Sequence, residues 1–201
     1  ERNFTFDFAD SDTYQWRYRP LFFCEDKGMK NREIDISFIG TLHTKRLQVV
    51  KRLMEFCEEN QYTNFLYLYC NKLIYLKKKY IEHDDKYQGL SDGNVKFKSL
   101  SLEETNIIYG KSKVVVDYTA EQTGLTMRTI ESLGNGCKLV TNNKYIKNTD
   151  LYYPENILLY TGESCDIPKA FVEEPCKGLP LEIRNRYMLE NWVREIFGGT
   201  T

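Results

Sequence analysis

The chain has 201 residues, 41% of them hydrophobic, which is enough for one sizeable domain with an ordinary core. Its formal net charge of -1 at pH 7 is not the basic balance typical of nucleic-acid-binding domains, so no nucleic acid partner is expected. No apolar run approaches the roughly 20 residues that a membrane-spanning helix needs. The six cysteines form no CxxC pair and there are only two histidines, a pattern that predicts reduced thiols in a cytoplasmic protein rather than a zinc site.

The first 30 residues are aromatic and irregular, and Arg19-Pro20 breaks regular structure. Two interpretations are open: residues 1–30 are a linker or the tail of a missing N-terminal domain, or they form an arm that packs on this domain's own surface. Residues 31–180 are expected to form the main domain. Residues 181–201 are expected to form a C-terminal helix.

The first half of the main domain alternates strands and helices. Residues 34–39 read as a strand, 40–43 as a tight loop, and 44–60 as a helix with one apolar face. Residues 65–70 read as a second strand, and the following apolar positions indicate a partly basic helix up to Tyr80.

A polar loop at 82–94 leads to a weaker strand at 95–100. Ser101 and Glu104 then have the spacing of a capping box, which predicts that a short helix begins there; we expect it to end at Gly110.

The most informative stretch is 113–143, which reads as strand, polar loop, helix and strand. Val114, Val115 and Val116 are β-branched and too few for a helix, and 134–136 (Gly-Asn-Gly) ends the helix that follows. Leu139 and Val140 begin the next strand, 156–160 reads as a sixth strand, 162–180 as loop, and 181–197 as the last helix. This alternation predicts an α/β fold, a Rossmann-like doubly wound parallel sheet with helices on both faces.

A βαβ unit of this kind binds ligands at the carboxyl ends of its strands, near the helix N-terminus. The backbone N–H groups of Leu125, Thr126 and Met127 are therefore candidates for holding a phosphate. Arg128 suits phosphate, and Glu131 suits paired hydroxyl groups.

These residues carry a family resemblance. The segments DISFIGTLHTKR (35–46) and VVDYTAEQTGLTMRTIESLGNGCKLVTNN (115–143), and more weakly YRPLFF (18–23), resemble the C-terminal, nucleotide-sugar-binding half of bacterial GT-B glycosyltransferases of lipopolysaccharide and capsular polysaccharide biosynthesis. The resemblance covers residues 18 to about 160, and the middle segment is the specific one. It implies transfer of a sugar from a nucleoside diphosphate to an acceptor, without a metal or other cofactor.

The resemblance also implies roles for residues. Glu131 would accept hydrogen bonds from the ribose hydroxyls of the donor, Gly124, Leu125 and Thr126 would hold the diphosphate, and Arg128 would lie near it. Gly40, Thr41, Leu42 and His43 would border the same cleft, Lys45 or Arg46 would add positive charge, and Gln122 and Tyr118 would lie near the sugar or base.

The sequence departs from the family pattern in two ways. Many GT-B enzymes carry two glutamates eight positions apart, but Thr123 stands eight residues before Glu131, and Glu121 is displaced by two. A complete enzyme also has a second Rossmann-like domain, expected here on the N-terminal side, which presents the glycan or lipid-linked glycan acceptor. The chain alone is therefore expected to bind donor and to transfer little.

Simpler interpretations stand beside these. Glu131 could pair with Arg128 on a solvated helix face, His43 could be an ordinary exposed residue, and Lys77–Lys79 reads either as a solvated helix face or as a peripheral contact with anionic lipid. A non-catalytic nucleotide or nucleotide-sugar binding module on the same fold is the alternative function. A receiver-like domain is disfavoured, because Asp35 lies at the start of the first strand and not at its end.

Overall fold

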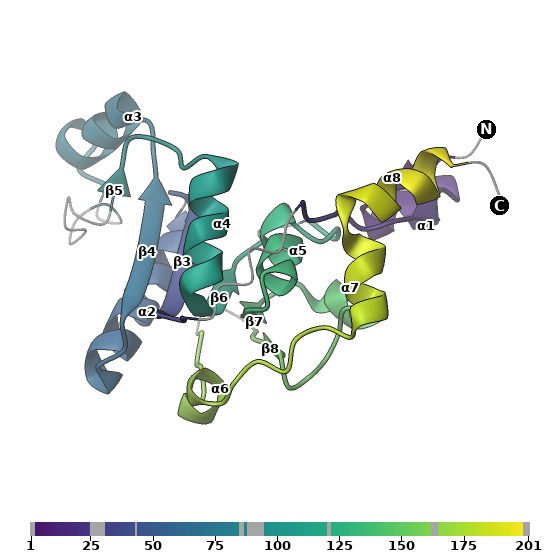
Figure 1. Cartoon of the computed structure of the whole chain (residues 1–201). Coiled ribbons are helices and arrows are strands. Elements are labelled where there is room, and N and C mark those ends of the chain that lie inside the picture. The colour runs from purple at the N-terminus through teal and green to yellow at the C-terminus, as the bar shows by residue number, and fades with distance from the viewer. Residues whose placement is uncertain are drawn as a thin grey trace.

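A computed structural model describes residues 3–24, 31–42, 44–84, 87, 95–119, 122–161 and 165–198. Its centre is a six-stranded parallel sheet with the order β5-β4-β3-β6-β7-β8 (Figure 1). The strands are β3 (Ile34–Thr41), β4 (Asn64–Tyr69), β5 (Val95–Lys96), β6 (Ser112–Asp117), β7 (Lys138–Thr141) and β8 (Ile157–Leu159). The predicted α/β, Rossmann-like parallel sheet is confirmed.

Helices cover both faces of the sheet. On one face α2 (Thr44–Asn60) and α6 (Lys169–Glu173) pack against side chains that include Ile36, Phe38 and Val114. On the other face α4 (Leu102–Lys111) packs against Val115, and α5 (Met127–Gly134) packs against Leu139 and Ile157. The strands are buried on both sides, which explains why 114–116 reads as a continuous apolar run.

Local sequence signals for helix ends are confirmed where they are strongest. At the start of α4, Glu104 N–H donates to Ser101 Oγ at 3.1 Å, and Ser101 N–H donates to the Glu104 carboxylate at 2.7 Å. After α5, Gly136 adopts a left-handed conformation with φ of 71°. Glycine takes that conformation without the steric clash that a Cβ would introduce.

Several predicted boundaries are wrong. Gly40 and Thr41 do not form a tight loop but extend β3, because they continue its pairing with Leu68 and Tyr69. The strand predicted at 95–100 is only two residues long, and 162–180 contains the helix α6. Of the loop predicted at 82–94, residues 85–86 and 88–94 lie outside the described residues.

The single C-terminal helix predicted at 181–197 is also wrong. It is divided into α7 (Leu181–Tyr187) and α8 (Leu189–Phe197) at Met188, whose ψ of 141° is extended. The extended residue pairs with Phe23: Phe23 N–H donates to Tyr187 O, and Leu189 N–H donates to Phe23 O, each at 3.0 Å. A backbone partner far away in sequence thus outweighs local helix propensity at this position.

The N-terminal segment packs on the domain itself. It contains β1 (Phe4–Thr5), α1 (Phe8–Tyr14) and β2 (Arg17–Tyr18), and in Figure 1 it lies beside α8 at one end of the molecule. Its Asp7 contacts the loop before α5, and its Arg19 pairs with Glu195 of α8. Residues 3–24 therefore form an arm that packs on this domain. That this segment also links the domain to a further one stays a prediction.

The basic helix expected after β4 is present as α3 (Lys72–Leu76) continued by the π-helical turn η1 (Lys77–Ile81), and a short 3-10 helix, η2 (Lys144–Asn148), follows β7. In Figure 1, α3 lies at the opposite end of the molecule from α8. Among the helices that the structure describes, none has the length and apolar character to cross a bilayer.

Candidate functional site

The strand order defines where a ligand is expected. From β3 the chain moves to β4 and β5 on one side, and from β6 it moves to β7 and β8 on the other, so β3 and β6 flank the point where the order reverses. In open α/β sheets, ligands bind outside the carboxyl ends of the strands at this point. Here those ends carry Gly40 and Thr41 on β3 and Asp117 and Tyr118 on β6.

Asp117 organises this edge, although its sequence position predicts only the polar loop after the strand. It is the last residue of β6 and is fully buried. Its carboxylate accepts hydrogen bonds from Thr126 Oγ1, from Thr129 Oγ1 at 2.8 Å and from Arg128 Nε at 2.9 Å. Asp117 therefore fixes the first turn of α5 against the end of β6.

Arg128 is held by this carboxylate but not enclosed by it. Burial alone would lower the pKa of its guanidinium, but Asp117 outweighs that effect and the pKa is raised, so the group stays charged. Its side chain remains 25% exposed, and its Nη1 and Nη2 atoms make no hydrogen bond to any described residue. Two forked N–H donors are thus presented at the edge of the sheet, the arrangement that suits a phosphate.

Arg46 brings a second cation to the same place from the first turn of α2. Its Nη1 donates to Thr41 Oγ1, and its Nη2 donates to Tyr118 O at 3.4 Å, so it bridges the ends of β3 and β6. Burial, followed by the neighbouring Arg128, lowers its pKa, while Asp117 raises it. Lys45, the alternative cation considered from the sequence, is exposed.

Glu131 is a buried residue whose carboxylate has no hydrogen-bond partner among the described residues. The residue lies one turn after Arg128 in α5 and is only 6% exposed, which makes the interpretation of a solvated helix face wrong. Burial raises the pKa of its carboxyl to about 7, although Arg128 acts in the opposite direction. No hydrogen bond or ion pair to this carboxylate comes from the residues that the structure describes. Its oxygens are not among the fully enclosed polar atoms, so they can accept hydrogen bonds from a ligand.

Tyr109 from α4 adds a further polar group to this cluster. Its ring is fully buried, and its hydroxyl has no hydrogen-bond partner in the described part of the chain. Burial raises its pKa well above the ordinary value, and the charges of Arg128, Asp117 and Glu131 also act on it. Tyr109 was not identified from the sequence.

The predicted diphosphate turn is partly occupied by the N-terminal arm. Gly124 N–H donates to Asp7 Oδ2 at 2.9 Å, and a Cβ on Gly124 would lie 2.5 Å from Phe6 O. This close approach explains the glycine. Leu125 is fully buried in the apolar cluster beneath α5, so its side chain serves packing.

The N-terminus of α5 is more accessible than the turn at Gly124. Thr126 is the N-cap of α5, and its side chain accepts a hydrogen bond from Thr129 N–H at 3.1 Å. The N–H groups of Leu125, Thr126 and Met127 make no hydrogen bond to a described residue, which is the state expected of a helix N-terminus able to receive an anion.

The remaining predicted residues divide into two groups. Gly40 lies buried beneath Arg46, with an added Cβ only 3.6 Å from Arg46 Cδ, and Tyr118 is buried beside the same arginine. Gln122 is exposed and makes no hydrogen bond to the described part of the chain, and His43 lies outside the described residues. Thr41, Arg46, Tyr118 and Arg128 are thus brought together with Glu131 nearby.

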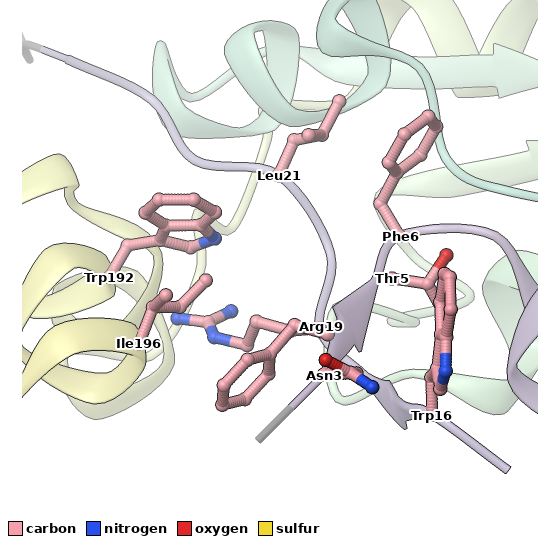
Figure 2. A pocket seen from close by; sticks show the side chains of 9 residues that line it. Asn3, Thr5, Phe6, Trp16, Arg19, Leu21, Trp192 and Ile196 are labelled. Atoms are coloured by element: carbon pink, nitrogen blue, oxygen red, sulfur yellow. The ribbon is translucent and has the colours of Figure 1, made fainter. Parts of the chain in front are cut away.

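A separate pocket of about 490 Å³ lies between the arm and α8 (Figure 2). Figure 2 shows Arg19 extended between Ile196 of α8 and the arm, with Trp16 and Phe6 on the opposite side. Arg19 is 2% exposed, its Nη2 donates to Arg186 O at 2.7 Å, and its Nε lies 2.8 Å from the Glu195 carboxylate. Its remaining nitrogen, Nη1, is buried behind protein atoms. The pocket therefore offers mainly aromatic surface and no accessible cation from Arg19.

The described residues contain no group of three or more His, Cys, Asp or Glu side chains arranged to hold a metal ion. No protein-family model matches the chain, and a search of curated proteins finds no significant relative. The geometry at the ends of β3 and β6 is therefore what a functional proposal must rest on.

Proposed function

We propose that this chain is the donor-binding half of a glycosyltransferase that moves a sugar from a nucleoside-diphosphate sugar to a lipopolysaccharide or capsule glycan. One observation carries the proposal: Glu131, a buried residue whose carboxylate has no hydrogen-bond partner in the described part of the chain, lies one turn from Arg128 at the switch point of the sheet. A carboxylate next to a cation suits a ligand that has both hydroxyl donors and negative charge. A nucleoside diphosphate has both, on its ribose and on its phosphates.

In the proposed complex, Glu131 accepts hydrogen bonds from the ribose hydroxyls. Arg128, Arg46 and the free N–H groups at the start of α5 contact the diphosphate. At this edge Arg128 is paired with Asp117 through Nε alone, which leaves its terminal nitrogens for an anion.

The reaction breaks the bond between the anomeric carbon and the diphosphate oxygen, and the electron pair stays on that oxygen. Arg128, Arg46 and the helix N-terminus would stabilise the charge that develops there. The acceptor hydroxyl, and the base that takes its proton, would come from the partner half. The protein's own cations fulfil the role that a metal has in other transferases.

The test is calorimetric titration of the chain with UDP, GDP, ADP and dTDP and with their sugar conjugates. We expect saturable binding of one nucleotide, weakened about 10–100-fold in Glu131→Ala because hydrogen bonds to a charged group are lost. Glu55→Ala is the matched control, since Glu55 is an exposed helical glutamate whose side chain is 61% exposed.

An affinity that is unchanged in Glu131→Ala would refute the role of this residue. Binding without sugar transfer, when the chain is joined to the acceptor-binding half encoded with it, would favour a non-catalytic nucleotide-sugar binding module.

A further inference from the structure

The segment that follows β4 presents an unusual surface. In α3 and η1, Leu73 is 76% exposed, Ile81 73%, Tyr80 56% and Ile74 53%. Single exposed apolar residues are common, but four within nine positions form a patch that marks an interaction site.

The patch has a defined orientation because one residue anchors the segment. Tyr75 is 1% exposed, and its ring lies 5.6 Å from that of Phe97 and 6.1 Å from that of Tyr87. Leu73, Ile74, Tyr80 and Ile81 are each more than half exposed, whereas Tyr75 between them is buried. The apolar side chains are therefore directed away from the domain by the fold itself.

Positive charge surrounds these side chains. The described residues 72–84 contain four lysines, at 72, 77, 78 and 79, against Glu82 and Asp84. Lys77 and Lys78 each contact Glu82, at 3.0 and 3.4 Å, and Lys72 lies 6.0 Å from the ring of Phe97. Lys96 and Lys98, on and just after the neighbouring strand β5, are also exposed. The local excess is cationic although the whole chain has a net charge of -1.

We propose that the α3–η1 segment docks this protein on an anionic lipid surface. Leu73, Ile74, Tyr80 and Ile81 enter the boundary between headgroups and acyl chains, and the lysines contact acidic headgroups. A nucleic acid would satisfy the lysines but would leave the aliphatic side chains in water, so the combination favours lipid.

The position of the patch has a consequence for the proposed donor site. The segment begins at the carboxyl end of β4, and because the sheet is parallel this is the same edge that carries Thr41 and Asp117. Docking through α3 and η1 brings that edge toward the bilayer, whereas α7 and α8 lie at the other end of the molecule (Figure 1). The docking proposal does not depend on nucleotide binding and is tested separately.

The experiment is co-sedimentation of the full chain with phosphatidylcholine vesicles, with and without phosphatidylglycerol. We expect binding that requires phosphatidylglycerol and falls as ionic strength rises from about 0.1 to 1 M, where the Debye length shrinks from about 10 to 3 Å. The double variant Leu73→Ser, Ile81→Ser should reduce the partition coefficient about tenfold or more, because two aliphatic side chains are removed from the boundary region.

Leu181→Ser with Phe197→Ser is the matched control, because those side chains are 69% and 77% exposed on α7 and α8. It should bind vesicles as the wild type does. A second variant, Lys72→Gln with Lys78→Gln, should weaken binding only to the acidic vesicles. All of these side chains are on the surface, so unchanged thermal unfolding verifies the fold.

Three results would overturn the proposal. The first is a wild-type chain that stays in the supernatant with acidic vesicles. The second is an equal loss of binding in the Leu73/Ile81 and Leu181/Phe197 variants. The third is tight binding to single-stranded RNA or to an acidic protein that the serine substitutions leave intact, with no vesicle binding.

Discussion

Two arginines that pair with carboxylates, the buried Arg19 and the partly exposed Arg128, show how similar pairs serve different purposes. Arg19, at the junction of the arm and α8, is paired with Glu195, bonded to a backbone carbonyl, and has only 1% of its side chain exposed. Arg128, at the end of β6, is paired through Nε alone, keeps 25% of its side chain exposed, and leaves its terminal nitrogens open.

The surroundings of the two pairs also differ. Around Glu195 lie three arginines, with Arg17 at 3.6 Å and Arg186 at 3.9 Å as well as Arg19, and Arg186 also pairs with Asp150. Around Arg128 lie the carboxylate of Glu131 and the hydroxyl of Tyr109, which have no hydrogen-bond partner among the described residues. The Arg19 pair joins two segments of the chain, and the nitrogen Nη1 that it leaves without a hydrogen-bond partner among the described residues is enclosed by protein. The terminal nitrogens of Arg128 lie on a partly exposed side chain, where a ligand can reach them.

The largest effect is expected from breaking the pair at the proposed site. Asp117→Ala removes a fully buried carboxylate with three hydrogen bonds and leaves Arg128 without its counterion, which should lower the free energy of unfolding by about 3–5 kcal/mol. Nucleotide affinity should fall as well, because the first turn of α5 is no longer fixed. Denaturant unfolding and calorimetric titration measure the two effects.

Glu190→Ala is the control for Asp117→Ala. The side chains of Glu190 and of its partner Arg194 are both exposed, so this ion pair should contribute at most about 1 kcal/mol to the free energy of unfolding. A loss of stability in Asp117→Ala with full nucleotide affinity would show that Asp117 supports the fold and not the site.

A smaller effect, on stability alone, is expected from the pair at the arm. Arg19→Met keeps an apolar stem but removes the ion pair with Glu195 and the bond to Arg186 O. Because Glu195 is 24% exposed and has other arginines nearby, we expect a loss of about 1–3 kcal/mol. Nucleotide affinity of the folded variant, measured by the same titration, should not change. An affinity that falls together with stability would mean that the two regions are coupled.

The sequence predicted the fold far better than the contacts of the site. The apolar run 114–116, the capping box at Ser101 and the glycine at 136 follow local rules, and the structure confirms them. The break at Met188 and the covering of Gly124 by Asp7 depend on partners more than 100 residues away in sequence. Local patterns contain no information about such partners.

The same limit applies to individual site residues. Arg128 and Glu131 were identified by their position on the helix, but the burial that raises the pKa of Glu131 comes from the packing around it. Asp117 had one usable signal, since a lone charge that ends an apolar run at a strand terminus is often buried and paired. Tyr109 had none, because a tyrosine near the end of a helix is ordinary in a chain with 15 tyrosines.

An effect no larger than that of Arg19→Met is expected in the pH dependence that arises from Glu131. Its pKa is raised from 4.5 to about 7 in the folded chain, so between these values the folded state binds more protons than the unfolded state. The stability contributed by the protonated carboxyl is therefore fully present below about pH 4.5 and is lost as pH rises toward 7. Glu131→Gln, which stays neutral, should unfold with a free energy about 1–3 kcal/mol higher than wild type at pH 8 and nearly equal at pH 4.

Without ligand, the folded chain favours the protonated carboxyl of Glu131. The proposed ligand should favour the ionised form instead, because its hydroxyl donors stabilise the carboxylate. Nucleotide binding to the wild type should therefore tighten from pH 6 to pH 8, and binding to Glu131→Gln should change less. If the free energies of unfolding of the wild type and of Glu131→Gln change in the same way between pH 4 and pH 8, then Glu131 is solvated and has an ordinary pKa. In that case Glu131 would not be the buried carboxylate that distinguishes this region from the arm.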